Sequence, residues 1–546
     1  MSPSTSSEYD AIVVGAGHNG IVASFYLARA GMRVLLLERG ERVGGLSTRI
    51  EFMPGYIGSI PNSPGSLEKL VSDDMHLSDF GLSYVRPDPT VVIPFHGGKG
   101  FIGYRDRDTL KEEIARFSKR DSTAYFQVLR DIESFARELG VSVLEPPPSL
   151  AELTSRLTTA EQEDWFARLF FGSARDLVDS YMESDEMKAV LAMLAMIIGG
   201  VGPSTPGSAF GFLLRPMSMA SSRVHGEDDP RNTPLRGSTG LPQGGMGAVT
   251  EAMARSATAA GVTILTEAPV ASISMSEAGV SGVVLTDGRE FRAPIVVSNA
   301  NPKTTLMDMG DPELLPDPIR ERLERTKMEG GAFKIGVALS GIPRFTFAKN
   351  RGLGDNDDLS SCQFRIAPTM DYLDDAWENA RRGIPSPGPK VWGLIPSLTD
   401  PTLAPEGKHF LSLNVWYAPY TLAEGEWDAR RRDDYARHCI NTLAEYMPDL
   451  PGLVEDFVAY SPLDLEEKFG LTEGNQLHGD MNPGRMFSLR PVAGMSDYRT
   501  PIKGLYLCGS GVWPGGTVTG LPGRNSAHQV IRDWETEVGE PDLEVA

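Results

Sequence analysis

The hydrophobic pattern begins with a short apolar run at residues 11–14, followed at once by a glycine-rich turn. Residues 21–30 then have apolar positions at helical spacing, and residues 33–37 form a second apolar run that ends at an acidic residue. Short apolar runs bounded by glycine are typical of buried strands, and a 3.6-residue period is typical of a helix. The pattern therefore predicts a strand–helix–strand unit.

Apolar strand patterns recur in two later parts of the chain. A helix that ends near Gly261 is expected to precede a series of strands near residues 262–266, 268–275, 282–286 and 295–298. The Asp287–Gly288 step predicts a hairpin turn between two of these strands. A last strand at residues 504–508 is followed by a helix over about residues 522–538. We expect these segments to complete the sheet that the first unit begins.

The two long stretches between these segments have different patterns. In the first, helices are predicted over residues 110–139, 160–182 and 186–198. In the second, β-branched and aromatic residues between turn residues predict strands at residues 333–339, 391–395 and 410–417. We expect the two stretches to form an inserted α+β domain.

The glycines of the first turn have the spacing of a dinucleotide-binding motif. Gly15 permits the tight turn, Gly17 lets the backbone approach a pyrophosphate, and Gly20 lets helix and strand pack closely. The helix N-terminus offers N–H groups and partial positive charge to the phosphates. Glu38 ends the second strand, where a carboxylate accepts hydrogen bonds from ribose hydroxyls. Strand, glycines, helix, strand and acid follow in the expected order, which favours a nucleotide site over a chance turn.

The residues after Glu38 favour FAD over NAD. Arg39 follows directly, and a second glycine pair, Gly44 and Gly45, comes a few residues later. In FAD enzymes that resemble glutathione reductase and the amine oxidases, this pair lies against the same pyrophosphate. We therefore predict an α/β fold with a discontinuous, glutathione-reductase-like Rossmann domain for FAD, formed by residues 8–61, 239–304 and 496–540. Residues 62–238 and 305–495 are predicted to form the α+β substrate domain.

Small residues after the last strand are expected to surround the flavin ring. The loop contains Gly509, Ser510, Thr517, Val518 and Thr519, and small residues let the backbone approach the ring closely. The helix that follows is expected to direct its positive end toward the ring, which stabilises reduced flavin. A second nucleotide site is disfavoured here, because Trp513 and Pro514 interrupt the segment. In the resembling FAD enzymes, the strand that carries Val270 borders the adenine.

The loop just before the last strand contains the candidates for chemistry. His478 and Asp480 lie beside glycines, and a histidine there can reach a pocket and titrate near neutral pH. The alternative is that both residues only tie the loop together. Arg490 is a candidate anchor for the flavin or for an anionic substrate. His18, inside the glycine turn, is interpreted as a loop residue far from the reactive ring.

Methionines are frequent in the first insertion, where a plain core role is favoured over an adaptable pocket. The members of this group are Met182, Met187, Met193, Met196, Met217 and Met219.

Charge and cysteine content exclude several classes of function. The 546 residues include 73 acidic and 52 basic side chains, a formal net charge of -21, which disfavours nucleic acid and anionic membranes as partners. Cys362, Cys439 and Cys508 form neither a CxxC pair nor a group with metal-ligand spacing, so we expect no metal site. The longest apolar stretch, residues 189–198, is too short for a membrane span. A cytoplasmic protein is expected, and a homodimer remains open.

The motifs together resemble the phytoene-desaturase-like FAD oxidoreductases, in the branch of phytoene-dehydrogenase-related and pyridine-nucleotide-disulfide-oxidoreductase-domain proteins. The resemblance covers most of the chain and is carried by residues 15–20, 38–45, 244–247, 397–409, 462–480 and 505–525. It implies FAD as sole redox cofactor, hydride removal from a C–C or C–N bond, and reoxidation by dioxygen or a quinone. Since the acidic surface does not suit membrane docking, we expect a smaller and largely apolar substrate.

Three alternatives share this architecture. An amine or amino-acid oxidase predicts peroxide production and a pocket with an acid or an aromatic cage. A flavin-dependent isomerase needs reduced flavin but no net oxidation. A lipid-binding escort protein would lack a working FAD site, which the intact motif from Gly15 to Glu38 opposes.

Overall fold

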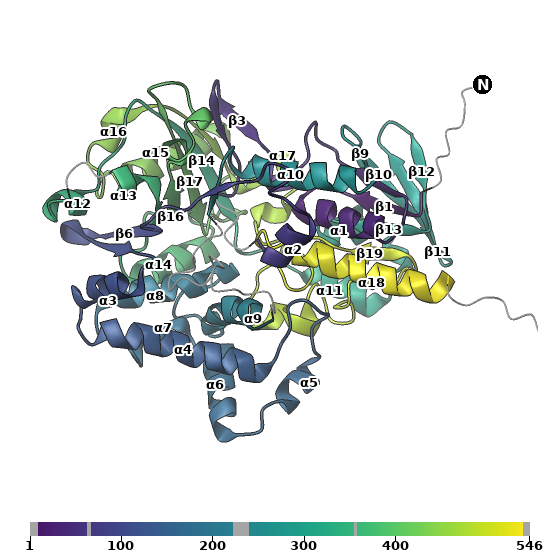
Figure 1. Cartoon of the computed structure of the whole chain (residues 1–546), viewed down its shortest axis with the longest axis horizontal. Helices are drawn as coiled ribbons and strands as arrows, with labels where there is room; N and C mark the ends of the chain where they lie inside the picture. Colours follow the sequence, from purple (N-terminus) through teal and green to yellow (C-terminus); the bar gives the residue numbers. More distant parts are fainter. Residues whose placement is uncertain (1–8, 63–66, 222–239, 354–356, 539–546) are drawn as a thin grey trace, which may run out of the picture.

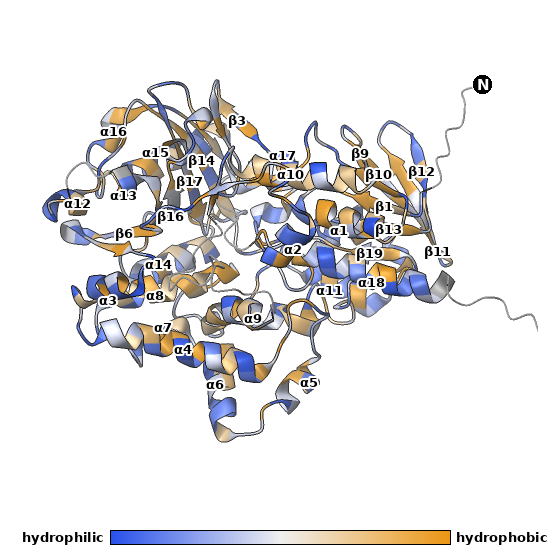
Figure 2. Ribbon diagram, in the orientation of Figure 1, coloured by the Kyte–Doolittle hydropathy of each residue, from blue (hydrophilic) through white to orange (hydrophobic). Residues whose placement is uncertain are grey.

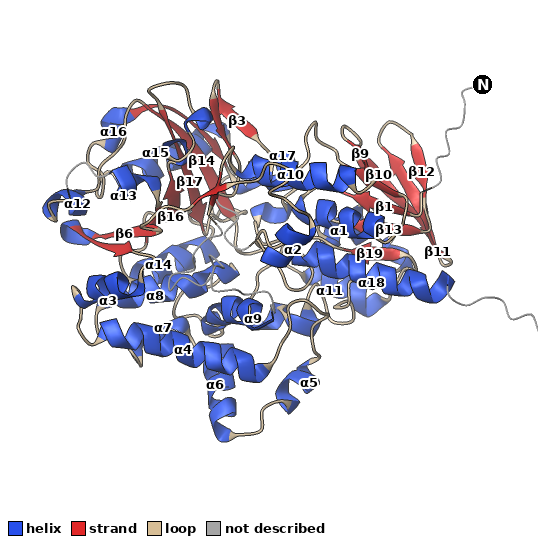
Figure 3. Cartoon of the chain, in the orientation of Figure 1, coloured by secondary structure: helices blue, strands red, loops and turns tan. Residues whose placement is uncertain are grey.

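The computed structural model describes residues 9–62, 67–221, 240–353 and 357–538. Two sheets lie at opposite ends of the molecule, and helices α3 to α9 lie along one side (Figure 1). Figure 3 shows the strands concentrated in these two regions and the helices between and below them. The predicted α/β architecture is confirmed.

The first sheet is parallel and contains five strands in the order β19-β13-β1-β2-β9. These strands are β19 (Leu505–Leu507), β13 (Ile295–Ser298), β1 (Ala11–Val14), β2 (Val34–Leu37) and β9 (Thr263–Leu265). Every residue of β1, β2 and β13 is buried, as expected for parallel strands covered on both faces. Helix α1 (His18–Arg29) packs between α10 (Met246–Ala259) and α18 (Leu521–Val538).

A small antiparallel sheet corrects one expectation. The Asp287–Gly288 turn joins β11 (Gly279–Leu285) to β12 (Glu290–Arg292), a strand that the pattern did not predict. β12 has three residues and is mostly exposed, so it has no apolar pattern. β10 (Val270–Ser276) pairs with the other side of β11.

The second sheet has seven strands in the order β18-β14-β17-β16-β15-β6-β7. The predicted strands are its centre: β14 (Ala332–Leu339), β16 (Lys390–Leu394) and β17 (His409–Trp416). The unpredicted strands are β18 (Val454–Tyr460), β15 (Gln363–Ile366), β6 (Val91–Phe95) and β7 (Lys99–Gly103). β6 and β7 come from the first insertion, which was expected to be helical. Both insertions therefore build one sheet.

The two faces of this sheet differ, as the alternation of side chains requires. On one face Phe333, Leu413 and Val415 join a buried cluster that includes Cys439 and Leu443 of α15 (Ala429–Leu443). The other face carries polar side chains toward the middle of the molecule. Figure 2 shows hydrophobic colouring along strands of both sheets.

Polar caps divide two of the predicted helices. Residues 110–139 form α3 (Arg107–Ala115) and α4 (Asp121–Leu139), because the Ser118 hydroxyl accepts a hydrogen bond from the Asp121 N–H and starts a new helix. Residues 160–182 form α6 (Ala160–Phe170) and α7 (Ala174–Asp179), and Ser173 caps the second.

The apolar stretch of residues 189–198 lies in α8 (Asp185–Ala195) and the 3₁₀ turn after it, and most of its side chains are buried. It belongs to a continuous apolar core that also includes the parallel sheet. Within the described residues, every helix is too short or too polar to cross a bilayer.

The remaining helices and strands are short. The helices are α2 (Lys69–Asp74), α5 (Leu150–Ser155), α9 (Leu214–Ser221), α11 (Asp317–Arg325), α12 (Thr346–Asn350), α13 (Asp357–Ser361), α14 (Met370–Arg381), α16 (Leu450–Leu453) and α17 (Pro462–Phe469). The strands are β3 (Ile50–Met53), β4 (Tyr56–Gly58), β5 (Tyr84–Val85) and β8 (Leu241–Pro242).

Candidate active site

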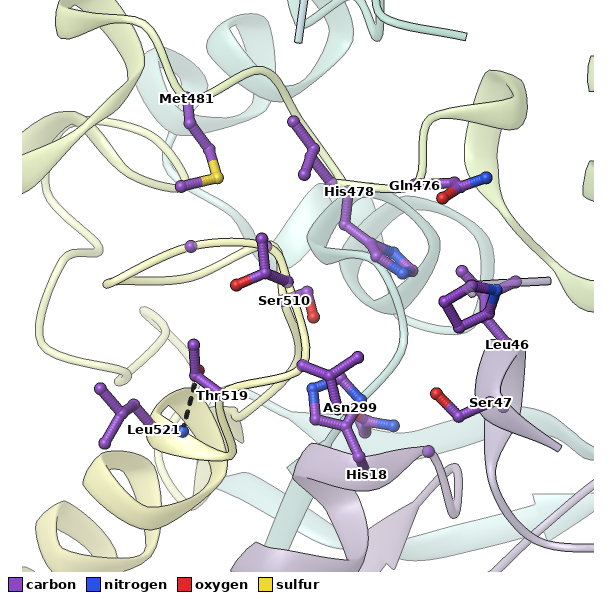
Figure 4. Close-up of a pocket in the computed structure, with 18 of the residues that line it drawn as sticks. His18, Leu46, Ser47, Asn299, Gln476, His478, Met481, Ser510, Thr519 and Leu521 are labelled. Atoms are coloured by element: carbon purple, nitrogen blue, oxygen red, sulfur yellow. Dashed lines mark hydrogen bonds between the residues drawn. The ribbon is translucent and has the colours of Figure 1, made fainter. Parts of the chain in front are cut away.

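A cavity of about 630 Å³ runs from the parallel sheet to the polar face of the seven-stranded sheet. Gly15 and Glu38 line one end, and Trp392 and Trp416 line the other. Figure 4 shows part of its wall, where residues from α1, the segment around Leu46, and the loop after β19 converge. One continuous space therefore connects the dinucleotide motif with the second sheet.

The glycine turn has little space for side chains. Gly15 has φ +92°, and a Cβ atom on Gly17 would lie 2.7 Å from Nδ2 of Asn299. A Cβ on Gly20 would lie 2.0 Å from the carbonyl oxygen of Gly15, so Gly20 closes the turn from behind rather than lining the cavity. Gly17 forms a backbone bridge with Gly44.

The start of helix α1 can receive a phosphate group. Gly17 caps the helix without a side-chain hydrogen bond, so the first N–H groups have no competing cap. Gly15, Gly17, Gly44 and Gly45 all line the cavity here. The arrangement matches what a pyrophosphate requires: close backbone approach and a helix N-terminus.

Glu38 is fixed at the end of β2. Its carboxylate accepts hydrogen bonds from the backbone N–H groups of Ala16 (2.8 Å) and Gly40 (2.9 Å), and it remains part of the cavity wall. Val270 lines the cavity at the same end. Arg39 also lines it, and its guanidinium donates to the carbonyl of Lys468. A ribose and an adenine fit this end.

Four of the five residues predicted in the C-terminal loop line the cavity: Ser510, Thr517, Val518 and Thr519. Gly509 does not, because it packs against β13; a Cβ there would lie 2.6 Å from the carbonyl oxygen of Asn299. The Thr519 hydroxyl accepts a hydrogen bond from the Leu521 N–H at the start of α18. The helix thus begins at the cavity wall, as the sequence predicted, and Thr519 is hydrogen-bonded to its first residue.

His478 lines the cavity, but it does not titrate near neutral pH as the sequence suggested. Burial, and then the charge of Arg490, lower its pKa to about 4. His18 lines the same cavity, and burial followed by the charge of His478 also lowers its pKa to about 4. Figure 4 shows the two rings entering this region from different elements. His18 is therefore closer to the candidate chemistry than expected, and both rings are neutral at pH 7.

Asp480 corrects a second expectation, because it does not line the cavity. Its buried carboxylate accepts hydrogen bonds from the N–H groups of Gly200, Glu329 and Gly330 and from Nδ2 of Asn475, at 3.0–3.2 Å. This carboxylate fixes the loop that carries His478. Asp480 is a positioning residue.

Arg490 is likewise structural rather than an anchor for flavin or substrate. It is 2% exposed, and its guanidinium donates to five backbone carbonyl groups. The accepting residues are Leu477, Gly479, Asp480, Ser510 and Val512. Arg490 therefore ties the His478 loop to the loop after β19.

A polar row crosses the seven-stranded sheet at the far end, where Arg365, Trp392 and Asn414 line the cavity, and the sequence pattern did not predict it. Arg365, Trp392, Asn414 and Lys334 are direct neighbours on β15, β16, β17 and β14. Lys334 Nζ donates to Oδ1 of Asn62, Oγ of Ser412 and Oδ1 of Asn414, and burial holds its pKa well below the ordinary value. A signal existed: basic residues stand inside otherwise apolar strands.

The methionine cluster divides between the two expected roles. Met193, Met217 and Met219 line the cavity, whereas Met182, Met187 and Met196 are buried in the core without lining it. Met309, Met481 and Met486 line the cavity from other segments. Part of the cavity wall is therefore apolar and flexible.

Comparison with known proteins gives the same cofactor class. The family model described as flavin containing amine oxidoreductase matches residues 20–530. The chain is 34% identical to pyridine nucleotide-disulfide oxidoreductase domain-containing protein 2 of Rattus norvegicus, covering 96% of this chain and 94% of that one.

Two bacterial enzymes and a solved structure are more distant. A limonene dehydrogenase component of Castellaniella defragrans is 25% identical, over 97% of both chains. The neurosporene-forming phytoene desaturase of Rhodobacter capsulatus is 24% identical, over 100% of this chain and 97% of that one. The structure of a putrescine oxidase triple mutant, at 15% identity, has a TM-score of 0.60 and covers 97% of this chain and 99% of that one. The resemblance to the phytoene-desaturase-like proteins is confirmed. The chain belongs to the flavin-containing amine oxidoreductase family and is an FAD-dependent oxidoreductase.

Proposed function

We propose that this oxidoreductase dehydrogenates a largely apolar small molecule in the cavity described above, and that dioxygen or a quinone takes up the electrons. The single observation that carries the proposal is the continuity of the cavity. It joins the cofactor cradle around Gly15 and Glu38 to an apolar wall that includes Met193 and Met217. Bound FAD supplies an acceptor for the hydride, which leaves a proton for the protein to remove.

His478 is the proposed acceptor of that proton, at a ring nitrogen. A pKa of about 4 keeps the imidazole in its neutral, proton-accepting form over the physiological range, and it makes the ring a weaker base than a histidine that titrates near pH 7. The loop geometry supports this role, because Asp480 and Arg490 fix the backbone on both sides of the histidine. His18 lies near it but contributes no charge at neutral pH.

The residues proposed to hold FAD belong to three segments. Gly15, Gly17, Gly44 and Gly45 face the pyrophosphate, and Glu38, Arg39 and Val270 face the adenosine. The loop that includes Ser510, Thr517, Val518 and Thr519 faces the flavin ring. Gly20 and Gly509 act from behind this surface by allowing close packing.

Amine oxidation is the second candidate. Trp392 and Trp416 line the cavity with ring centroids 5.2 Å apart, and aromatic pairs can enclose an amine. Arg365 lies against the Trp392 ring and lines the cavity, and its positive charge disfavours a protonated amine. Dehydrogenation of a neutral or anionic carbon skeleton fits the site better.

The test is flavin reduction under anaerobic conditions. The purified holoprotein is mixed with unsaturated hydrocarbons, fatty acids and amines, and loss of the oxidised flavin bands is followed by stopped-flow absorbance. We expect reduction by a compound with an apolar skeleton, followed by reoxidation on adding dioxygen or a quinone. Reduction by amines alone would replace the proposal with the second candidate.

A further inference from the structure

Arg365 is an unusual cation for the interior of a protein. It lines the cavity from β15 and stacks on the ring of Trp392, with the guanidinium carbon 4.5 Å from the ring centroid. Its Nε is buried without a hydrogen-bond partner, and no carboxylate lies within ion-pair distance of it among the residues that the structure describes. The side chain is half-buried and faces the cavity, where a guanidinium without an anion is costly, since charges withdrawn from water are normally paired.

The groups around Arg365 mostly donate hydrogen bonds. The indole Nε1 atoms of Trp392 and Trp416 are buried and, within the described part of the chain, also lack partners. Indole and guanidinium groups can only donate. Lys390, directly opposite Trp416 in the sheet, donates to the carbonyl of Met196 and to Oη of Tyr417. Among the described residues, this end of the cavity therefore offers hydrogen-bond donors, and no carboxylate pairs with Arg365.

A second arginine lines the cavity. Arg215 of α9 lines the same cavity, and the charges of Arg215 and Arg365 both act on the buried Tyr125. Lys334 and Lys390 donate to protein acceptors behind the cavity surface, whereas the described cavity lining includes Arg365 and Arg215. The planar guanidinium of Arg365 matches a carboxylate that binds with two oxygen atoms.

We propose that the substrate is an organic acid whose carboxylate binds Arg365 while its hydrocarbon body lies along the methionine-lined wall. The wall residues Met193, Leu194, Ile197 and Met217 surround the body, and the row on the sheet surrounds the head group. The inference rests on the proposed function, because it assigns a substrate class to the same site. The substrate is then amphipathic, with a carboxylate at one end, rather than purely apolar.

The test compares head groups of equal chain length. Octanoate, dodecanoate, hexadecanoate and phenylacetate are titrated into the FAD-loaded protein, beside octan-1-ol, octylamine and octyl phosphate. Binding is followed by calorimetry and by the shift of the flavin bands. The variants are Arg365→Met, Arg365→Lys and, as matched control, Arg381→Met, whose arginine pairs with Glu378 on the surface.

We expect at least one carboxylate to bind, and octanoate to bind more tightly than octan-1-ol or octylamine of the same chain length. Arg365→Met should weaken that carboxylate by at least about tenfold without weakening octan-1-ol, because a hydrogen-bonded charge pair is lost. Arg365→Lys should retain part of the affinity, and Arg381→Met all of it. Unchanged FAD content and melting temperature in Arg365→Met would show that its effect is local.

Several results would overturn the inference. These are no binding by any of the four acids, equal loss of alcohol and acid in Arg365→Met, tighter binding of octyl phosphate than of octanoate, or loss of FAD from Arg365→Met. The proposed function fails separately. If acids bind through Arg365 but no compound reduces the flavin, the carboxylate site stands and the proposed dehydrogenation fails. If only neutral hydrocarbons reduce the flavin, the dehydrogenation stands and the carboxylate site fails.

Discussion

Gly17 shows how one absent side chain makes room for a cofactor. In Gly17→Val, the new side chain would meet Asn299 and enter the space between the first turn and the Gly44–Gly45 segment. We expect purified Gly17→Val to have lost the flavin absorbance at about equal protein yield. Gly452→Ala is the matched control, since a Cβ there meets nothing within 4 Å. A yellow Gly17→Val protein with normal FAD content would contradict the cradle described here.

His478 is the residue for which the sequence and the structure differ most in chemistry. His478→Gln should slow flavin reduction by about 10²–10⁴-fold while FAD stays bound, because the proposed proton acceptor is lost. Stopped-flow absorbance gives the rate, and acid release gives the FAD content. His438→Gln is the control, because that histidine lies exposed on α15, away from the cavity, where it stacks on Tyr435 and contacts the carbonyl of Pro387. An unchanged reduction rate in His478→Gln would remove the residue from the mechanism.

At the scale of elements, the loop between α17 and β19 depends on Asp480 for its shape. Asp480→Ala removes the shared acceptor of Gly200, Gly330 and Asn475 and leaves buried donors unpaired. We expect the free energy of unfolding to fall by about 3 kcal/mol. Urea denaturation measures this change. If Asp480 positions His478, Asp480→Ala should also slow flavin reduction at saturating substrate.

A matched surface carboxylate separates this effect from a general loss of charge. Asp497 pairs with Arg499, and both side chains are more than 40% exposed, so Asp497→Ala should cost about 0–1 kcal/mol. Equal stability losses in the two variants would contradict the structural role of Asp480.

Helix α18 provides a second test at this scale. Thr519→Ala removes the hydroxyl that accepts the N–H of the first helical residue, and such a hydrogen bond contributes about 0.5–1.5 kcal/mol. We expect a lower melting temperature, and Thr519→Ser should restore it because serine retains the accepting oxygen. A melting temperature of Thr519→Ala equal to that of the parent protein would mean that this hydrogen bond contributes nothing to stability.

At the scale of the whole molecule, three histidines should make folding sensitive to acid. Burial is the first cause that lowers the pKa of His18, His478 and His528 from 6.5 to about 4. Between these values the unfolded chain binds more protons than the folded one, so stability falls as pH falls through this window. Urea denaturation at a series of pH values should show the decline. His528→Gln, away from the cavity, should reduce its slope, and an unchanged slope would contradict the burial of that ring.

The sequence by itself determined the parts that depend on local patterns. The glycine spacing, the apolar runs of β1 and β2, and Glu38 predicted the dinucleotide unit and FAD, because turn geometry and strand periodicity are set by neighbouring residues. The centre of the second sheet, β14, β16 and β17, was visible for the same reason.

Only the tertiary structure decided which distant segments meet. β6 and β7 join the second sheet through β15, more than 250 residues later in the chain, and short strands carry no sign of their partner. The roles of Asp480, Arg490 and Arg365 depend on whether backbone groups or an open cavity lie opposite each side chain. A charged residue in a loop or strand has the same sequence signal in both cases. Its surroundings, which folding creates from remote parts of the chain, determine whether it supports the fold or faces a ligand.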